Sequence, residues 1–113
     1  MARQDRSYLD EALVRAAEKG HTPFVRGLIL LDADIHTQCE APLRVAALGG
    51  YMDTVAVLRA NGGSLVDAIK YAKAAGEEMA VLNLTGYMEM ERNRYIVFAK
   101  GRRDSLRPST RHP

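Results

Sequence analysis

An internal repeat constrains the fold of this chain more than any other feature of its sequence. The stretch 41–58 reads as a short helix, a Gly-Gly turn and a second helix running back, with Pro42 at an expected first helical position. The same pattern occurs 30 residues earlier and again 26 residues later. The matched sets are Leu13, Leu43 and Ile69; Ala16, Ala46 and Ala72; Gly20, Gly50 and Gly76; Val25, Val55 and Val81; Leu28, Leu58 and Leu84. Because one helix pair cannot bury its apolar faces alone, three copies predict a stack of helix hairpins.

The spacing of apolar residues predicts an all-α chain. Helices are expected at 8–19, 22–31, 41–49, 52–60, 65–75 and 77–90. Ser7 and Ser64 each begin a capping box, in which the acidic residue three positions on reaches back to the N-cap amide. Thr22 precedes Pro23, which predicts a hydroxyl N-cap followed by proline at the first helical position.

The C-terminal part of the chain divides into two predicted segments. Tyr95-Ile96-Val97-Phe98 is strand-like in propensity but too isolated to form a sheet. We expect the segment before residue 100 to form a helix that caps the end of the stack. The domain is therefore expected to span 1–100, and 101–113 is expected to be a basic, flexible tail.

The repeated residues resemble the ankyrin-repeat family. The family pattern runs T-P-L-H-x-A-A-x-x-G-H, followed by a second helix that ends in L-L-x-x-G-A-D-V. The middle copy here reads Ala41-Pro42-Leu43-Arg44-Val45-Ala46-Ala47-Leu48-Gly49-Gly50-Tyr51, and the first copy ends in Asp32-Ala33-Asp34-Ile35. The likeness covers about residues 9–87. It implies a short solenoid of about three helix-turn-helix repeats with a C-terminal capping segment.

The chain also departs from the family pattern. The family threonine and histidine are absent from all three copies, where the chain has Glu11 and Val14, Ala41 and Arg44, and Asp67 and Lys70. Periods of 30 and 26 residues, against 33 in a full repeat, predict a shortened hairpin finger at 32–40 and almost none at 62–66. A generic stack of α-hairpins without the family's hydrogen-bond network is the alternative.

Composition places the chain among soluble globular proteins of one domain. It has 113 residues, of which 47% are hydrophobic and 27% charged. The N-terminus shows no signal peptide, and the longest strictly apolar run, 28–31, is far too short to span a bilayer. Because Cys39 is the single cysteine, the sequence predicts a reducing compartment, and we expect a cytoplasmic protein without a membrane partner.

No catalytic or metal site is predicted. His36 and Cys39 lie three residues apart, but a zinc site needs two more ligands and a nucleophile pair needs an orienting group. His21 falls at a turn position where the family pattern itself has histidine. The sequence has no phosphate-binding glycine motif. We therefore expect a non-enzymatic protein without cofactor or metal.

The charges are distributed unevenly along the chain. Residues 1–91 hold nine Lys and Arg against thirteen Asp and Glu, a net charge of −4, whereas 92–113 hold seven against one, a net of +6. The basic segment has three interpretations: it binds nucleic acid, it binds an acidic protein surface such as a second copy of the chain, or it has no role. The candidate nucleic-acid-binding residues are Arg92, Arg94, Lys100, Arg102 and Arg103.

The ankyrin resemblance implies a binding face made of the first helix of each repeat and the fingers. Its variable positions are Arg15, Glu18, Lys19, Val45, Leu48, Tyr71 and Ala74, with His36, Gln38 and Glu40 in the finger. Leu48 and Tyr71 are the best candidates for energetic hot spots. We expect a protein-binding module that acts by occupying a partner's surface, as an inhibitor or adaptor, and microbial or viral effectors of this size fit the pattern. The alternative is a nucleic-acid-associated protein. The partner and the oligomeric state stay open.

Overall fold

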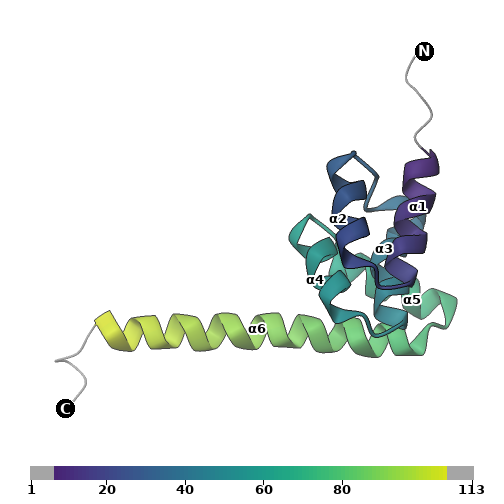
Figure 1. Cartoon of the computed structure of the whole chain (residues 1–113). Helices are drawn as coiled ribbons and strands as arrows, with labels where there is room; N and C mark the ends of the chain where they lie inside the picture. The colour runs from purple at the N-terminus through teal and green to yellow at the C-terminus, as the bar shows by residue number, and fades with distance from the viewer. Residues whose placement is uncertain (1–6, 107–113) are drawn as a thin grey trace.

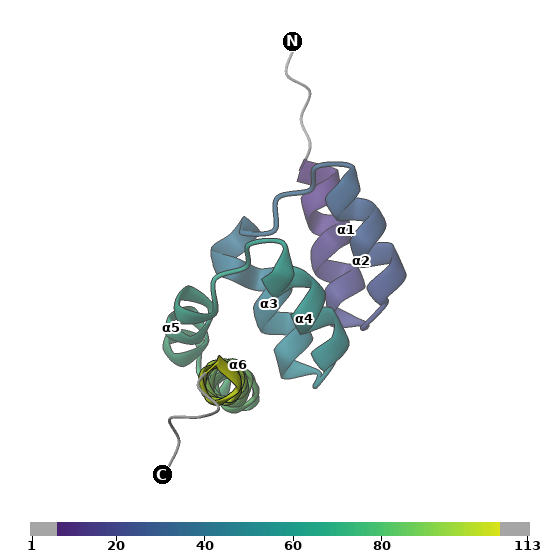
Figure 2. The same ribbon diagram turned by 90° about the vertical axis from the view of Figure 1, so that its left-hand side faces the viewer.

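The computed structural model describes the backbone of residues 7–106 and the side chains of residues 7–94. Within this range every regular element is helical, which confirms the all-α expectation. The helices are α1 (Ser7–Glu18), α2 (Thr22–Leu30), α3 (Thr37–Leu48), α4 (Met52–Ala60), α5 (Leu65–Ala75) and α6 (Glu78–Leu106). Consecutive helices pack as the pairs α1/α2, α3/α4 and α5/α6, and α3 also contacts α1 and α5 (Figures 1 and 2).

The turn inside each helix pair has the same backbone geometry in all three copies. In each turn the backbone N–H of the residue after glycine donates to a carbonyl five residues earlier. These bonds are His21 to Ala16 (3.0 Å), Tyr51 to Ala46 (2.9 Å) and Glu77 to Ala72 (2.9 Å). The three glycines have φ of 71°, 78° and 76°. This left-handed backbone conformation is sterically unfavourable for residues that have a Cβ. The 30- and 26-residue offsets of the sequence are therefore also offsets of the turns.

The apolar positions of the repeat form the core. The fully buried side chains include Leu13 and Leu43, Val25 and Val55, and Leu58 and Leu84. Ala46 and Ala72 are 0% exposed, as expected for positions at which neighbouring helices meet. Ile69 and Val81 of the third copy are only partly buried against this core. The third copy thus follows the pattern less completely than the first two.

The start of α3 is unusual. Gln38, Cys39 and Glu40 all have left-handed backbone conformations, with φ of 53°, 61° and 61°. Regular right-handed helix begins only after these residues, which agrees with the predicted start at 41. Each left-handed residue with a Cβ is disfavoured by about 1–2 kcal/mol, so the surrounding contacts must stabilise this segment, hereafter the left-handed turn.

The predicted helix cap at Thr22 differs from expectation. Thr22 is the first residue of α2 and not its N-cap, which is His21. The Thr22 hydroxyl instead forms a hydrogen bond of 2.9 Å with the Thr54 hydroxyl on α4. Pro23 stands in the first turn as predicted. The Asp10 carboxylate accepts the backbone N–H of Asp34 at 2.7 Å and so links α1 to the connection before α3.

The third cap is half confirmed. Ser64 is the N-cap of α5, and its Oγ accepts the backbone N–H of Asp67 at 3.1 Å. The backbone N–H of Ser64 donates to Glu40 Oε1 at 3.3 Å, so Glu40 takes the role that the sequence assigns to Asp67. A residue from the neighbouring hairpin therefore completes this cap.

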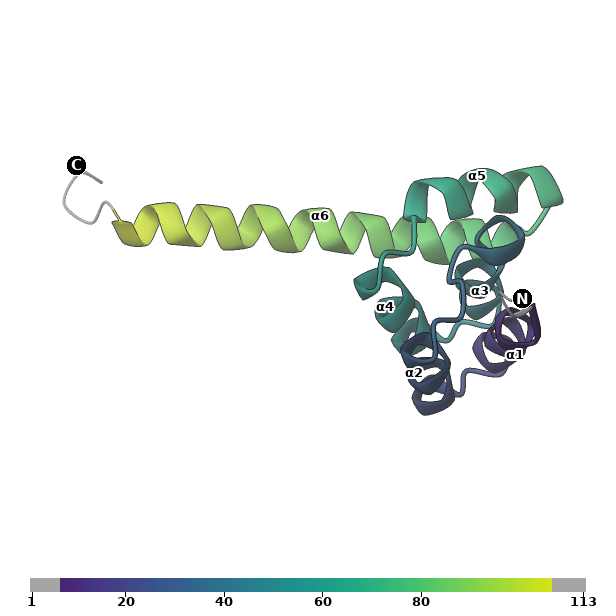
Figure 3. The same ribbon diagram turned by 90° about the horizontal axis from the view of Figure 1, so that it is seen from above.

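Helix α6 is longer than the sequence analysis expects. The helix expected at 77–90 and the capping helix expected before residue 100 form one continuous helix, which runs to Leu106 and whose 29 residues span about 43 Å. Its first part packs on α3 and α5 as the expected cap. Asn83 Nδ2 donates to the Ala47 carbonyl at 2.7 Å, and Arg59 on α4 pairs with Glu91 at 3.1 Å. Beyond these contacts α6 extends away from the body (Figures 1 and 3). The first proline after its start is Pro108, so the sequence contains no strong helix breaker before that point.

Candidate interaction surface

The inner helices α1, α3 and α5 carry most of the residues that the sequence analysis assigns to a binding face. Arg15, Val45 and Tyr71 are related by the 30- and 26-residue offsets of the repeat, and so are Glu18, Leu48 and Ala74. Because α3 lies between α1 and α5 and contacts both, these two rows cross all three inner helices. We call them together the inner face.

The inner face changes from charged to apolar along the stack. Arg15, Glu18 and the adjacent Lys19 are exposed at the end of α1. Leu48, the last residue of α3, is 43% exposed. Val45 and Tyr71 are half-buried and Ala74 is exposed. Lys70 Nζ lies 5.7 Å from the centre of the Tyr71 ring, within cation–π range. Leu48 therefore offers the larger exposed fraction, and Tyr71 offers a half-buried ring with a cation over it.

The finger residues divide into two groups. His36 and Gln38 are exposed, as a binding role requires. Glu40 is only 4% exposed, and its carboxylate is engaged inside the fold. The sequence places Glu40 in an exposed finger because it does not reveal the left-handed turn, which directs this side chain inward. We therefore remove Glu40 from the candidate binding residues.

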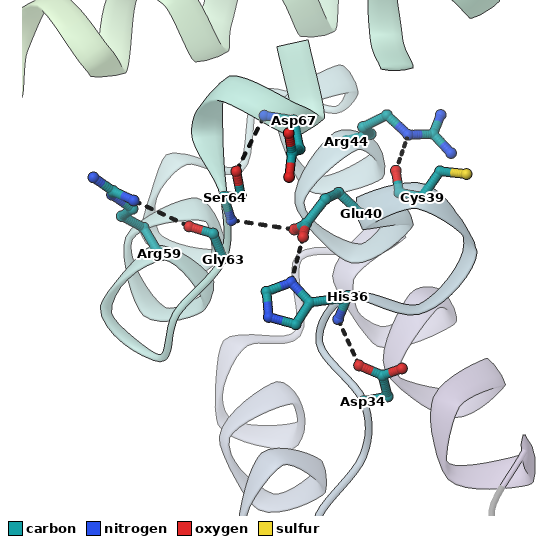
Figure 4. A network of polar contacts seen from close by, with 9 residues as sticks. All are labelled: Asp34, His36, Cys39, Glu40, Arg44, Arg59, Gly63, Ser64 and Asp67. Atoms are coloured by element: carbon teal, nitrogen blue, oxygen red, sulfur yellow. Dashed lines mark hydrogen bonds and ion pairs between the residues drawn. The ribbon is translucent and has the colours of Figure 1, made fainter. Parts of the chain in front are cut away.

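Glu40 is the centre of a polar network that joins three segments of the chain (Figure 4). One carboxylate oxygen accepts the backbone N–H of Ser64, and the other pairs with Nδ1 of His36. The backbone N–H of His36 in turn donates to Asp34 Oδ1 at 2.9 Å. A carboxylate beside the first turn of α5 is also favoured by the helix dipole. The network fixes the connection 31–36 against the start of α5.

Arg44 stabilises the left-handed turn from its other side. Its guanidinium donates to the carbonyls of Cys39 at 2.9 Å and Gln38 at 3.1 Å. The same group forms a bidentate pair with Glu77, at 2.7 and 2.8 Å. Glu77 lies in the turn between α5 and α6, so one side chain couples the second and third hairpins. The sequence analysis missed this pair because its two members are 33 residues apart.

The basic residues of the alternative function lie on α6, away from the inner helices. Arg92 and Arg94 are exposed, and Arg92 lies 3.5 Å from Glu89. Lys100, Arg102 and Arg103 lie on the backbone of α6, but their side chains are outside the described set. The structure therefore separates the two candidate binding regions.

The structure also exposes apolar residues that the sequence analysis did not single out. Phe24 on α2 and Leu31, the residue after its end, are 61% and 59% exposed. Thr54, which is equivalent to Phe24 at the 30-residue offset, is fully buried on α4. Thr54 is buried because α2 of the preceding hairpin packs beside α4. Phe24 is exposed because the described chain has no hairpin before α1 and α2 that could cover it in the same way. On the part of α6 whose side chains are described, 78–94, the large exposed apolar residues are Met79, Leu82 and Met90.

Neither family models nor curated proteins nor solved structures gave a match to this chain. Across residues 7–106, the structure contains no helix with the length and apolar character needed to cross a membrane. Among the described side chains, no cluster of three or more His, Cys, Asp or Glu residues could hold a metal ion. Cys39 is exposed and carries a free thiol.

Proposed function

We propose that this chain is a non-enzymatic protein-binding module built as a short ankyrin-like stack of three repeats. The repeated turn geometry and the shared core positions support the repeat. In such a stack the inner helices present a continuous face to a partner. The module would act by occupying that partner's surface, as an inhibitor or an adaptor.

The observation that carries the proposal is the exposure of Leu48 on the inner face, one repeat before Tyr71. Apolar and aromatic side chains with a polar surround are typical of the centre of a protein interface. The charges of Arg15, Glu18 and Lys19 would form part of the rim, where they affect the association rate more than the residence time. The partner surface is thus expected to combine an apolar centre with flanking charges of both signs.

Rigidity of the left-handed turn also supports a binding role. Hydrogen bonds from Arg44 and the Glu40 network fix the segment that carries exposed His36 and Gln38. A surface that is ordered before binding loses less conformational entropy on association. The finger residues are therefore suited to contact a partner without rearrangement.

The test is a quantitative pull-down from the cell of origin with the purified chain as bait. With Leu48→Asp as bait, the specific partner is expected to be absent from the recovered proteins, because the variant places an unpaired charge at the centre of the interface. Leu30→Asp is the matched control, since Leu30 is 86% exposed on α2 and lies outside the inner face. Loss of the partner with both variants, or with neither, would contradict the proposal.

A second candidate function is nucleic-acid binding, and the length of α6 favours it. The helix carries five basic residues between Arg92 and Arg103 on a part that extends from the body. Binding of duplex DNA through phosphates weakens steeply with salt. Fluorescence anisotropy across a salt series tests this candidate, and Arg92→Ala is expected to reduce the slope of log affinity against log salt by about 1. Absence of DNA binding at low salt would eliminate it.

A further inference from the structure

The half of the inner face that carries Leu48 is basic. Arg15, Lys19 and Lys70 are exposed there, and no ion pair among the described side chains involves any of them. Residues 1–91 as a whole carry a net charge of −4, with nine basic against thirteen acidic residues, so this positive charge is local. We call this part of the surface the basic half.

The exposed acidic residues of α1, α3 and α5 are Glu11, Glu18 and Asp67. Glu11 and Asp67 are equivalent in the repeat and lie about one turn before Arg15 and Tyr71, nearer the helix starts. The helix dipole favours negative charge at that end, so their position needs no ligand. Only Glu18 lies in the basic half, which therefore holds three cations against one anion.

The cations of the basic half lie on both sides of α3. Arg15 and Lys19 are at the end of α1, and Lys70 is on α5. Between them α3 presents exposed Leu48 and half-buried Val45. Packed helices have axes about 8–10 Å apart, so each group of cations lies about 10 Å from the apolar residues of α3. The surface is thus an apolar stripe between two positive ends.

We propose that the inner face binds an acidic protein segment that has one apolar anchor residue. The anchor contacts Leu48 and Val45. One carboxylate faces Arg15 and Lys19, and a second carboxylate faces Lys70. An extended chain advances about 3.3 Å per residue, so the two acidic residues lie about three positions before and after the anchor. This assignment rests on the proposed function, which supplies the binding face, and adds the charge and spacing of the ligand.

Lys70 can bind a carboxylate without leaving its present position. Its Nζ lies 5.7 Å from the centre of the Tyr71 ring. An ammonium group has three N–H donors, so one side can face the ring while the other donates to a carboxylate. Glu18 disfavours a further carboxylate beside the anchor and is complementary to one basic residue there. Negative charge therefore predominates on the ligand, although both signs are present.

The ionic and apolar contacts contribute differently to binding. Exposed ion pairs each add little affinity, but they accelerate association and exclude ligands of the wrong charge. Burial of the anchor against Leu48 provides most of the affinity. The charge of the ligand thus determines selectivity, and the anchor determines the residence time.

Selection from a phage-displayed library of random linear peptides on the complete immobilised chain tests this ligand. Enriched peptides are expected to carry an apolar residue with Asp or Glu about three positions to either side. In fluorescence anisotropy, Leu48→Asp should bind the synthesised peptides at least about a hundredfold more weakly, since it buries a charge against the anchor. Leu30→Asp, at an exposed leucine on α2, is the matched control and should bind them normally. Dependence on Leu48 separates these peptides from any that the basic residues of α6 retain.

Charge reversal tests the assigned contacts. Arg15→Glu and Lys70→Glu should each weaken binding of the selected peptides by about tenfold at low salt, because each replaces an attraction with a repulsion. The effect should be smaller at high salt. Arg26→Glu, at an exposed arginine on α2 outside the inner face, is the control and should leave the affinity unchanged.

The outcomes separate this ligand from the proposed function. Basic or uncharged peptides that depend on Leu48 would overturn the acidic ligand and leave the proposed function standing. Acidic peptides that tolerate both charge reversals would also overturn the acidic ligand. Peptides that bind Leu48→Asp as well as the wild type, or a selection without enrichment, would contradict the proposed function together with this ligand.

Discussion

The ring of Tyr51 occupies the space beside Gly20, across the boundary between the first two hairpins. A Cβ built on Gly20 would lie 2.5 Å from Cδ1 of Tyr51, and one on Gly49 would lie 2.6 Å from Cε2 of the same ring. The ring therefore packs where two glycines leave room for it. This contact joins the turn of the first copy to the turn of the second.

Gly20→Ala is expected to reduce the free energy of unfolding by about 2–4 kcal/mol. The substitution places a Cβ in a left-handed conformation, which costs about 1–2 kcal/mol, and it also displaces the Tyr51 ring. Gly76→Ala is the matched control, because Gly76 has nearly the same φ but nothing within 4 Å of an added Cβ. Urea denaturation of both variants separates strain from packing. Equal losses would show that the Tyr51 contact contributes nothing.

Arg44→Met is expected to destabilise the fold by about 2–3 kcal/mol. It leaves Glu77, whose side chain is only 23% exposed, without its partner, and it removes two hydrogen bonds to the left-handed turn. Arg59→Met is the comparison: it breaks a more exposed pair with Glu91 and one hydrogen bond, to the Gly63 carbonyl, so the loss should be smaller, about 1 kcal/mol. A double-mutant cycle of Arg44→Met with Glu77→Gln measures the pair itself. Additive single losses would mean that the pair has no coupling energy.

Gln38→Gly is expected to stabilise the protein by about 0.5–1 kcal/mol. Gln38 has a φ of 53°, where glycine has no steric penalty, and this gain exceeds the entropy cost of glycine in the unfolded chain. Glu11→Gly, at an exposed site inside regular helix α1, should have the opposite sign and cost about 1 kcal/mol. Thermal unfolding of the two variants provides the test. A destabilising Gln38→Gly would be inconsistent with a left-handed turn at this position.

The elements that could be predicted from sequence are those that local pattern determines. The sequence pattern predicts five of the six helices to within a few residues and the burial of Ala46 and Ala72. These features are predictable because apolar spacing and glycine turns depend only on residues close together in sequence. The helix expected at 77–90 ends about four turns before Leu106, the last residue of α6. Its charged second half shows no clear apolar periodicity, and the helix has no proline to end it before Pro108.

The parts of the candidate surface that could not be predicted depend on contacts distant in sequence. The burial of Glu40 follows from a backbone conformation that no sequence pattern specifies. The local sequence gives Thr22 a capping role. Its actual hydrogen-bond partner, Thr54, is 32 residues away and does not appear in the local pattern. Met79, Leu82 and Met90 lie within the helix expected at 77–90, so these exposed apolar residues could have been found from their helical spacing.

The most direct test of the proposed function is calorimetry with the partner that the pull-down isolates. The titration compares the wild-type chain with Tyr71→Ala and Leu48→Ala, after circular dichroism has confirmed that both variants are folded. If the inner face is the binding site, Tyr71→Ala should weaken the complex by at least about 2 kcal/mol, and Leu48→Ala by about 1 kcal/mol or more. Arg15→Ala should have a smaller effect that decreases at high salt. Unchanged affinity in both folded variants would contradict the assignment of the inner face.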